Sequence, residues 1–320
     1  MGRCRAICLA LGVLPASWLL AATQPLTSLA LLLGRRRRRA TEALLAARLG
    51  VPARSAESRR IVRGAFRNML LNLVEPVLLE RELARGRSLS DFVSVQGGEH
   101  LQAALASGRG VIVSTGHIGA WEGLAIVLHQ LGKPAWIVTR TSKNARIDAL
   151  LLRRRLAWAR GRLPKKGSAL RMARLLRAGE WFGLALDQDA GRQGLPLEFL
   201  GATASHHPVA GFMAVHARSL ALPVCLLREP GRLRFRLVVE PAIEPDPALG
   251  GSLAQVDVTR RLSRALEHRV REHPEQWLWL HDRWRGARRA RTAAIPHSGA
   301  PARARASRVR MRDAIPAQGV

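Results

Sequence analysis

The spacing of apolar residues changes along this 320-residue chain, near residue 91. From residue 91 onward, short apolar runs alternate with stretches in which apolar positions recur every three or four residues, the patterns of buried strands and of amphipathic helices. Predicted strands cover residues 92–95, 110–115, 135–139, 181–186, 222–227 and 232–240. Predicted helices cover residues 99–107, a stretch from 122, 145–160, 168–178, 208–220 and 253–272. This alternation predicts one α/β domain at residues 91–285, with a mixed sheet flanked by helices.

The N-terminal segment is the longest apolar stretch. Residues 7–33 carry no charge and include two prolines, and five consecutive arginines follow at 35–39. The stretch exceeds the ~20 residues that a membrane-spanning helix needs, and its prolines also allow a kinked helix or a shallow hairpin. A cleaved signal peptide is the alternative, since two arginines precede the run and residues 20–22 resemble a weak cleavage site. We expect residues 1–39 to be a membrane anchor with a basic flank that keeps the rest of the chain in the cytoplasm.

Residues 40–90 form a predicted helical lead-in, interrupted at 50–52 and again near Pro76. Its helically spaced apolar residues are Leu44, Leu45, Leu49, Ile61, Phe66, Met69, Leu70, Leu73 and Val77. Two interpretations fit this pattern: packing on the α/β domain, which we favour, or contact with a membrane surface.

The C-terminal region contains two different patterns. Residues 274–284 carry three tryptophans among leucines, and we favour a role in the core over one at a bilayer interface. Residues 286–320 hold eight arginines among alanine, proline, serine and glycine. Because this tail has few apolar residues to bury, we expect it to be disordered.

The composition is strongly basic, with a formal net charge of +29. Such a charge fits contact with nucleic acid, an anionic membrane or an acidic protein, and the charge alone does not choose among them. Lysine occurs at only four positions and tyrosine is absent, so part of the basicity reflects a compositional bias toward arginine. Three widely spaced cysteines exclude a disulfide framework and fit a reducing compartment.

Candidate chemistry lies in residues 110–123, where a short apolar run leads into two glycines, His117 and Glu122. Two side chains five positions apart on one helix point about 140° apart at roughly 100° per residue. They therefore meet only if His117 precedes the helix and Glu122 lies in its first turn. A carboxylate that holds one ring nitrogen leaves the other able to take a proton from a hydroxyl. A buried loop histidine beside a helix-capping glutamate is the alternative.

Further polar groups follow predicted strands, at the edge where open α/β folds bind ligands. Residues 140–144 contain arginine, lysine and asparagine that suit a phosphate, although a solvated loop explains them equally well. Residues 164–167 form a predicted turn with two lysines, and Asp187 and Asp189 end the apolar run before them. A turn or capping role explains these two acids as well as a metal does. The histidine pair at 206–207 has no cysteine or carboxylate at metal-ligand spacing, so we predict no metal site.

Together these blocks resemble the lipid A biosynthesis (lauroyl/myristoyl) acyltransferase family, within the lysophospholipid and glycerolipid acyltransferases. The resemblance covers residues 10–285. The matching blocks are His117 with Glu122, Arg140 with Asn144, Pro164-Lys165-Lys166-Gly167, Asp187-Gln188, Phe199-Leu200-Gly201 and residues 274–285. One His-x4-Glu motif is weak by itself, whereas several blocks in the same order are specific. Departures at Leu200, 206–208 and Asp282 put the acceptor and chain-length preference in doubt.

The resemblance implies a glycerolipid acyltransferase-like fold and an enzyme of the bacterial inner membrane that faces the cytoplasm. His117 would be the general base and Glu122 its orienting partner, while backbone amides at the start of the following helix or a basic side chain would bind the oxyanion. Implied substrate-binding residues are Arg140, Asn144, Arg154, Lys166, Asp187 and Gln188. Arg154 is the best match in the triple arginine 153–155 to an arginine that the family carries about thirty residues after the glutamate.

The implied reaction moves a fatty acyl chain from an acyl thioester to a hydroxyl of a lipid A precursor or related glycolipid. The donor is acyl carrier protein, an acidic partner, or coenzyme A, and no metal, other cofactor or nucleic acid is implied. Other acceptors, such as a phosphatidylinositol mannoside or an ornithine lipid, remain open. A different class is a membrane-tethered protein that binds anionic lipid or nucleic acid, in which His117 is structural.

Overall fold

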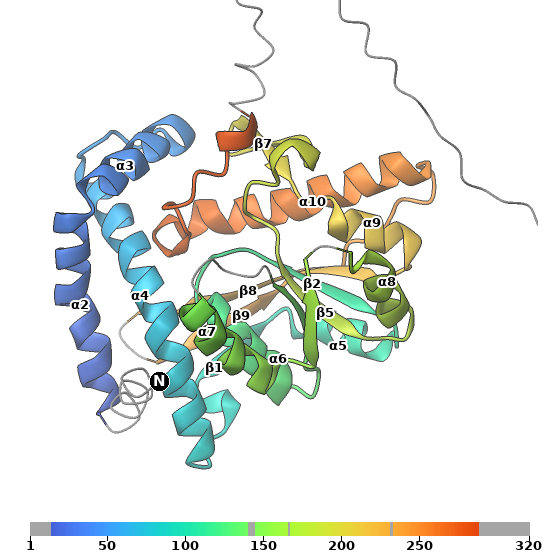
Figure 1. Ribbon diagram of the computed structural model, residues 1–320, viewed down its shortest axis with the longest axis horizontal. Coiled ribbons are helices and arrows are strands. Elements are labelled where there is room, and N and C mark those ends of the chain that lie inside the picture. Colours follow the sequence, from blue (N-terminus) through green and yellow to red (C-terminus); the bar gives the residue numbers. More distant parts are fainter. Residues whose placement is uncertain (1–13, 140–144, 166, 231–232, 288–320) are drawn as a thin grey trace, which may run out of the picture.

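A seven-stranded mixed sheet forms the centre of the computed structural model, which describes residues 14–139, 145–165, 167–230 and 233–287 (Figure 1). The strands are β1 (Val93–Gln96), β2 (Val111–Thr115), β3 (Trp136–Thr139), β4 (Gly161–Pro164), β5 (Trp181–Ala185), β8 (Leu220–Arg228) and β9 (Phe235–Val239). Their order is β1-β9-β8-β2-β5-β3-β4, and β8 with β9 is the antiparallel pair, whereas the other neighbours are parallel. The predicted α/β class with a mixed sheet is confirmed.

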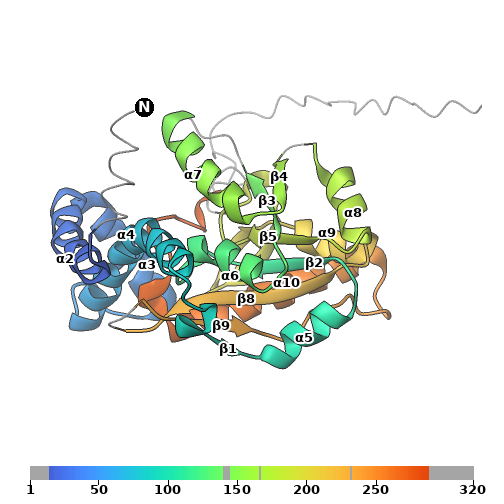
Figure 2. The same cartoon turned by 90° about the horizontal axis from the view of Figure 1, so that it is seen from below.

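Helices cover both faces of this sheet (Figures 1 and 2). They are α5 (Gly98–Ala106), α6 (Leu124–Gln130), α7 (Ala145–Trp158), α8 (Ala169–Arg177), α9 (Val209–His216) and α10 (Gly251–Glu272). Strand β2 shows why: Val111 and Val113 join the apolar cluster under α5 and α6, while Ile112 joins the cluster under α8, α9 and α10. Successive side chains of a strand point to opposite faces, so an all-apolar strand needs a cover on each.

The N-terminal helices lie together beside the ends of the central strands (Figures 1 and 2). They are α2 (Ala16–Leu33), α3 (Arg35–Leu49) and α4 (Ala56–Ala84). The predicted break at 50–52 is confirmed, since Gly50 ends α3 with a φ of 68° and the Ser55 hydroxyl caps α4 by accepting from Ser58 N–H at 3.0 Å. The predicted break near Pro76 is wrong, because α4 continues through it. A proline removes one helical hydrogen bond, and the buried face of α4 compensates for that loss.

Helix α2 exposes its apolar face. In the described part of the chain it is the one helix long and apolar enough to cross a membrane, with a mean hydropathy of 1.4 over 18 residues. Its buried residues are Leu19, Thr23 and Thr27, and Thr23 accepts a hydrogen bond from Arg67 of α4 at 3.1 Å. Its exposed leucines are Leu26, Leu29, Leu32 and Leu33. The more polar side of α2 therefore faces the protein.

The three tryptophans of the C-terminal block are core residues, as predicted. Trp277, Trp279 and Trp284 are each 1% exposed and pack with residues of α3, α4, β8 and β9 in a third apolar cluster. Three elements were not predicted: strand β4 and the antiparallel hairpin of β6 (Leu195–Phe199) and β7 (Ala202–His206).

Candidate active site

His117 and Asp187 lie side by side at one edge of the sheet. Strands β2 and β5 are parallel neighbours with Thr115 opposite Ala185, and each of the two functional residues comes two positions after the end of its strand. Asp187 Oδ1 lies 2.7 Å from His117 Nδ1. The register of two adjacent strands thus brings together residues 70 positions apart.

The Asp187 carboxylate is held firmly. Its Oδ2 accepts hydrogen bonds from the backbone N–H of His117 at 2.7 Å and from the indole Nε1–H of Trp277 at 2.9 Å. Because a carboxylate only accepts, the imidazole carries its proton on Nδ1, and the lone pair of Nε2 is free to act as a base. The amide Nε2 of Gln188 lies 3.4 Å from that nitrogen, in a part of the site that is open to solvent.

Glycine at position 119 is needed for the turn that carries the histidine. Gly119 has a φ of +62°, and a Cβ there would lie 2.1 Å from the carbonyl oxygen of Leu226. The same oxygen accepts from Ala120 N–H at 2.7 Å, and Gly119 N–H donates to the Gln276 carbonyl at 3.0 Å. The turn is therefore fastened to β8 on one side and to the tryptophan block on the other.

The charges around His117 suit a general base. Burial lowers the pKa of His117. The charge and hydrogen bond of Asp187, together with the charge of Glu122, raise it by more than burial lowers it, so the pKa lies above the ordinary value. Burial raises the pKa of Asp187, yet His117 and the nearby Arg283 outweigh that effect and hold the pKa well below its usual range. Asp187 therefore stays ionised, and it stabilises the imidazolium that forms when His117 takes a proton.

The sequence predicted Glu122 as the carboxylate that orients the histidine, whereas the structure places a different carboxylate on the ring. The carboxylate bonded to the ring is Asp187. Glu122 lies in the 3-10 turn Trp121–Gly123, where its Oε2 accepts from Arg155 Nε at 2.9 Å and its Oε1 from Arg155 Nη2. Its own N–H donates to Asn72 at 3.1 Å. The arginine forms a fork to both carboxylate oxygens and so holds Glu122 in place, while the charge of Glu122 still acts on His117.

Arg154, which the sequence matched to the family arginine, and its neighbour Arg155 pair with different carboxylates. Arg154 donates to Glu80 of α4 at 3.0 Å, while Arg155, 33 positions after Glu122, is the residue that pairs with it. Consecutive residues of a helix point about 100° apart, and here both arginines line one pocket, where each meets its own carboxylate. The sequence alone did not reveal which arginine meets Glu122.

Five backbone amides of the turn already donate hydrogen bonds. The N–H groups of His117, Gly119, Ala120, Glu122 and Gly123 donate to acceptors within the protein. An oxyanion hole made of these amides, as the sequence suggested, does not fit these hydrogen bonds. The side-chain amide of Gln188 lies beside the base, and the charge of Arg155 also acts on His117.

A buried polar network on α4 supports the turn from behind, and sequence reasoning missed it. Arg228 Nε and Nη2 donate to the two carboxylate oxygens of Glu75 at 2.5 and 2.6 Å, and Asn72 donates to the Gly119 carbonyl at 2.9 Å. Asn68, Asn72 and Glu75 are each 4% exposed or less. Their spacing of four and three residues on an otherwise apolar helix face was the available signal.

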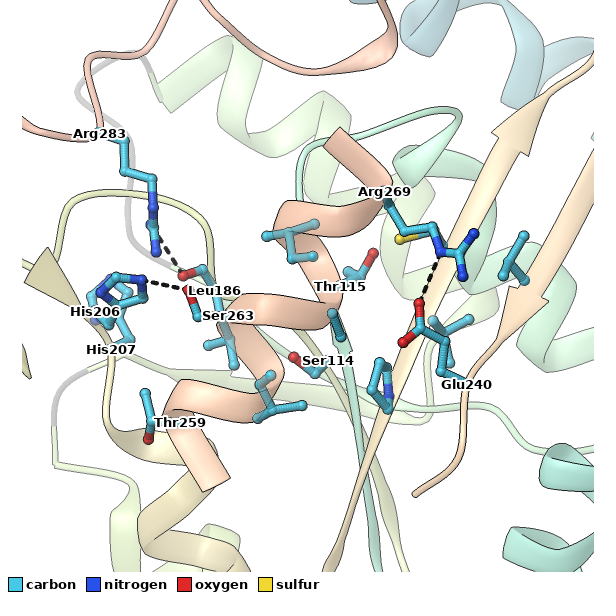
Figure 3. A pocket seen from close by; sticks show the side chains of 17 residues that line it. Ser114, Thr115, Leu186, His206, His207, Glu240, Thr259, Ser263, Arg269 and Arg283 are labelled. Carbon is cyan, nitrogen blue, oxygen red and sulfur yellow. Dashed lines mark hydrogen bonds and ion pairs between the residues drawn. The ribbon is translucent and has the colours of Figure 1, made fainter. Parts of the chain in front are cut away.

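Arg283 holds the other side of the site. This buried guanidinium donates to the carbonyls of Leu186 and Gln188, at 3.4 and 3.2 Å, and so braces the loop that carries Asp187. Burial lowers the pKa of Arg283 to about 10 even though Asp187 raises it, so the side chain stays charged at neutral pH. Figure 3 shows Arg283 at one end of a cavity of about 30 Å³, roughly the space of one or two waters, between β2 and α10.

Two other reactive residue types near this cavity are structural. His206 bonds Ser263 Oγ at 2.8 Å (Figure 3), and burial with the Arg283 charge lowers its pKa to about 4, so it is a neutral hydrogen-bonding group. Burial and the charge of Glu240 raise the pKa of the Cys225 thiol to about 12, which removes it as a nucleophile.

Three predicted substrate-binding residues, Arg140, Asn144 and Lys166, lie outside the described residues. The strands before them end at Thr139 and Pro164, and these strands are parallel to β5 and hence to β2. The loops that follow all four strands therefore begin at one edge of the sheet, as the prediction required.

Comparison of the sequence with known families gives a match over most of the chain. The pattern of the bacterial lipid A biosynthesis acyltransferase family matches residues 4–286. The chain belongs to this family. The lipid A biosynthesis acyltransferase of Haemophilus influenzae is 23% identical to it over 197 residues, which is 60% of this chain and 58% of that protein. The chain thus spans less than two thirds of that relative's length.

Membership of this family confirms the resemblance inferred from the motifs. The non-enzymatic binding protein is accordingly the weaker interpretation. The family is membrane-associated, which agrees with the exposed leucines of α2.

Proposed function

We propose that this protein transfers a fatty acyl chain from an acyl thioester, in our view acyl carrier protein, to a hydroxyl of a lipid A precursor or a related glycolipid. The observation that carries the proposal is the pair of His117 and Asp187 at 2.7 Å, in a chain that belongs to the lipid A acyltransferase family. No metal or other cofactor enters the reaction as we write it.

His117 Nε2 accepts the proton of the acceptor hydroxyl as that oxygen attacks the thioester carbonyl carbon. A carbon–oxygen bond forms, and the former carbonyl oxygen carries the negative charge of the tetrahedral intermediate. The carbon–sulfur bond then breaks, and the imidazolium returns the proton to the departing thiolate. Asp187 keeps the ring in the required tautomer throughout and stabilises its charged form.

We assign the oxyanion to Gln188, whose amide lies beside the base, and to the positive charge of Arg155, which acts on His117. Glu122 then acts by holding the guanidinium of Arg155 in place. Arg140, Asn144 and Lys166 are proposed to bind phosphates of the acceptor or of the donor's phosphopantetheine, because they follow strands that end at the same edge.

His117→Ala tests the proposal directly. Loss of a positioned general base costs roughly 10²- to 10⁴-fold in rate, so we expect transfer from acyl carrier protein to fall below a hundredth of the wild-type rate. His268→Ala is the matched control, since that imidazole is 61% exposed and pairs only at the surface of α10. More than a tenth of the wild-type rate in His117→Ala, with intact folding, would refute the mechanism.

A further inference from the structure

The three N-terminal helices line a basic cavity that opens to solvent, separate from the active site. Its volume is about 490 Å³. The lining residues are Leu31 of α2, Arg38, Arg39 and Glu42 of α3, Arg54 of the connecting turn, and Arg59, Val62 and Arg63 of α4. None of them contacts His117, Asp187 or the residues that position this pair. Five arginines against one glutamate leave a strong excess of positive charge.

The arginines are largely unneutralised. Among the described residues, Glu42 is the carboxylate within ion-pair distance of the cavity, 3.8 Å from Arg38 Nε. No ion pair within the described ranges involves Arg39, Arg59 or Arg63. Arg38 Nε is buried and has no hydrogen-bond acceptor in that part of the chain. The N-terminus of α4, which begins at Ala56, adds its own positive potential beside Arg59.

The apolar side of α2 continues from this cavity. Leu31 lines it, and the next two residues, Leu32 and Leu33, are 55% and 77% exposed. Exposed leucines next to a basic cavity fit a molecule that has an anionic head and an apolar tail. An acidic protein surface would match the charge but would leave these leucines without a partner.

The position of α2 also indicates how it meets the bilayer. Arginines of α4 bond along its length, Arg67 to Thr23 and Arg63 to Ser28, each at 3.1 Å. If α2 crossed the hydrocarbon core in this arrangement, these charged side chains would enter it too, at high cost. With α2 at the interface, the leucines enter the bilayer and the arginines stay at the level of the phosphates.

We propose that the cavity formed by α2, α3 and the start of α4 binds the phosphodiester headgroup of an anionic membrane phospholipid, and that α2 lies in the membrane interface beside it. This site is distinct from the acceptor site and does not depend on the proposed reaction. Its role is to seat the enzyme on the bilayer at a fixed orientation.

The test compares two double variants of the full chain that remove equal charge from one region. Arg39→Gln/Arg59→Gln removes two arginines of the cavity, and Arg36→Gln/Arg37→Gln removes two exposed arginines of α3 that do not line it. Binding is measured on phosphatidylcholine vesicles with and without phosphatidylglycerol. We expect the cavity variant to lose about tenfold more affinity for the anionic vesicles, the value of one charge-assisted hydrogen bond. Equal losses would show diffuse surface charge and overturn the proposal.

A charge-preserving variant sharpens the distinction. Arg39→Lys/Arg59→Lys keeps both charges but removes the guanidinium forks, so a headgroup site weakens while diffuse attraction stays the same. Full affinity in this variant would also overturn the proposal.

Turnover in neutral detergent checks that each variant folds and separates the possible ligands. KM for donor and acceptor should stay within about twofold of wild type, a change of only ~0.4 kcal/mol. A large rise in KM for acyl carrier protein or for the glycolipid would assign the arginines to a substrate instead. Displacement from vesicles by soluble glycerol phosphate at low concentration would indicate a free phosphate ligand, again against the proposal.

Discussion

Replacing Asp187 with asparagine changes the active site by one atom and tests which carboxylate serves the histidine. Asp187 accepts three hydrogen bonds: from His117 Nδ1, from the His117 backbone N–H and from the Trp277 indole. An asparagine that keeps its oxygen at the two N–H groups turns its NH₂ toward Nδ1. That nitrogen must then accept, so the ring proton moves to Nε2, where a base is required.

The opposite orientation of the asparagine amide is less stable. Its NH₂ would face the backbone N–H of His117 and the indole of Trp277, and each buried donor left without an acceptor costs about 1–3 kcal/mol. The Asp187→Asn enzyme is therefore held in the inactive tautomer. We expect kcat to fall by about 10²- to 10⁴-fold, or roughly 3–5 kcal/mol in barrier, the contribution of a positioned general base.

The assay is acyl transfer from acyl carrier protein measured as a function of pH. In wild type, kcat/KM should fall as the pH drops through the raised pKa of His117, because the protonated ring accepts no proton. Without the Asp187 charge, burial lowers that pKa, so the remaining activity of Asp187→Asn should persist to lower pH. Asp189→Asn is the control, since Asp189 Oδ1 accepts from Gly191 and does not touch His117. A kcat above a tenth of wild type, or an unmoved acid limb, would refute this account.

Three further predictions concern the surroundings of the site. Arg155→Gln should lower kcat at least about tenfold, as removal of an oxyanion donor does, while Arg154→Gln stays within about twofold; equal effects in steady-state assays would contradict the assignment. Glu75→Gln should lower the free energy of unfolding by about 3 kcal/mol, because it removes the buried carboxylate that neutralises the largely buried Arg228. Glu57→Gln, at the exposed start of α4, should cost less than about 1 kcal/mol. Denaturation in detergent measures both variants, and a small loss in Glu75→Gln would count against a tight ion pair. Deleting residues 288–320 should weaken membrane retention at high salt yet leave the turnover number within about twofold; a collapse in turnover would place the tail in the donor site.

Local patterns in the sequence were enough for most of the fold. Strands such as β2 and β5 stand out because their buried residues are contiguous and β-branched or aromatic, and α10 because its apolar positions follow one helical face. Strand β4 escaped detection because Gly161 and Pro164 in a four-residue strand leave almost no periodic signal. Pro76 led to the opposite error, a predicted helix end where the helix continues. Buried residues on both sides of Pro76 hold α4 together through a residue type that usually ends a helix.

For the candidate site, too, the sequence indicated the residues but not the contacts between them. The sequence placed His117 and Asp187 each just after an apolar strand, which was sufficient to single out both residues. It did not indicate that they meet, because strand order is decided by long-range pairing: β5 lies next to β2 although two other strands come between them in the chain. With that pairing unknown, the nearby Glu122 was the natural choice of partner, and only the folded chain showed it bound to Arg155. Spacing along a chain determines which residues can share one element, whereas contacts between elements depend on how the whole core packs.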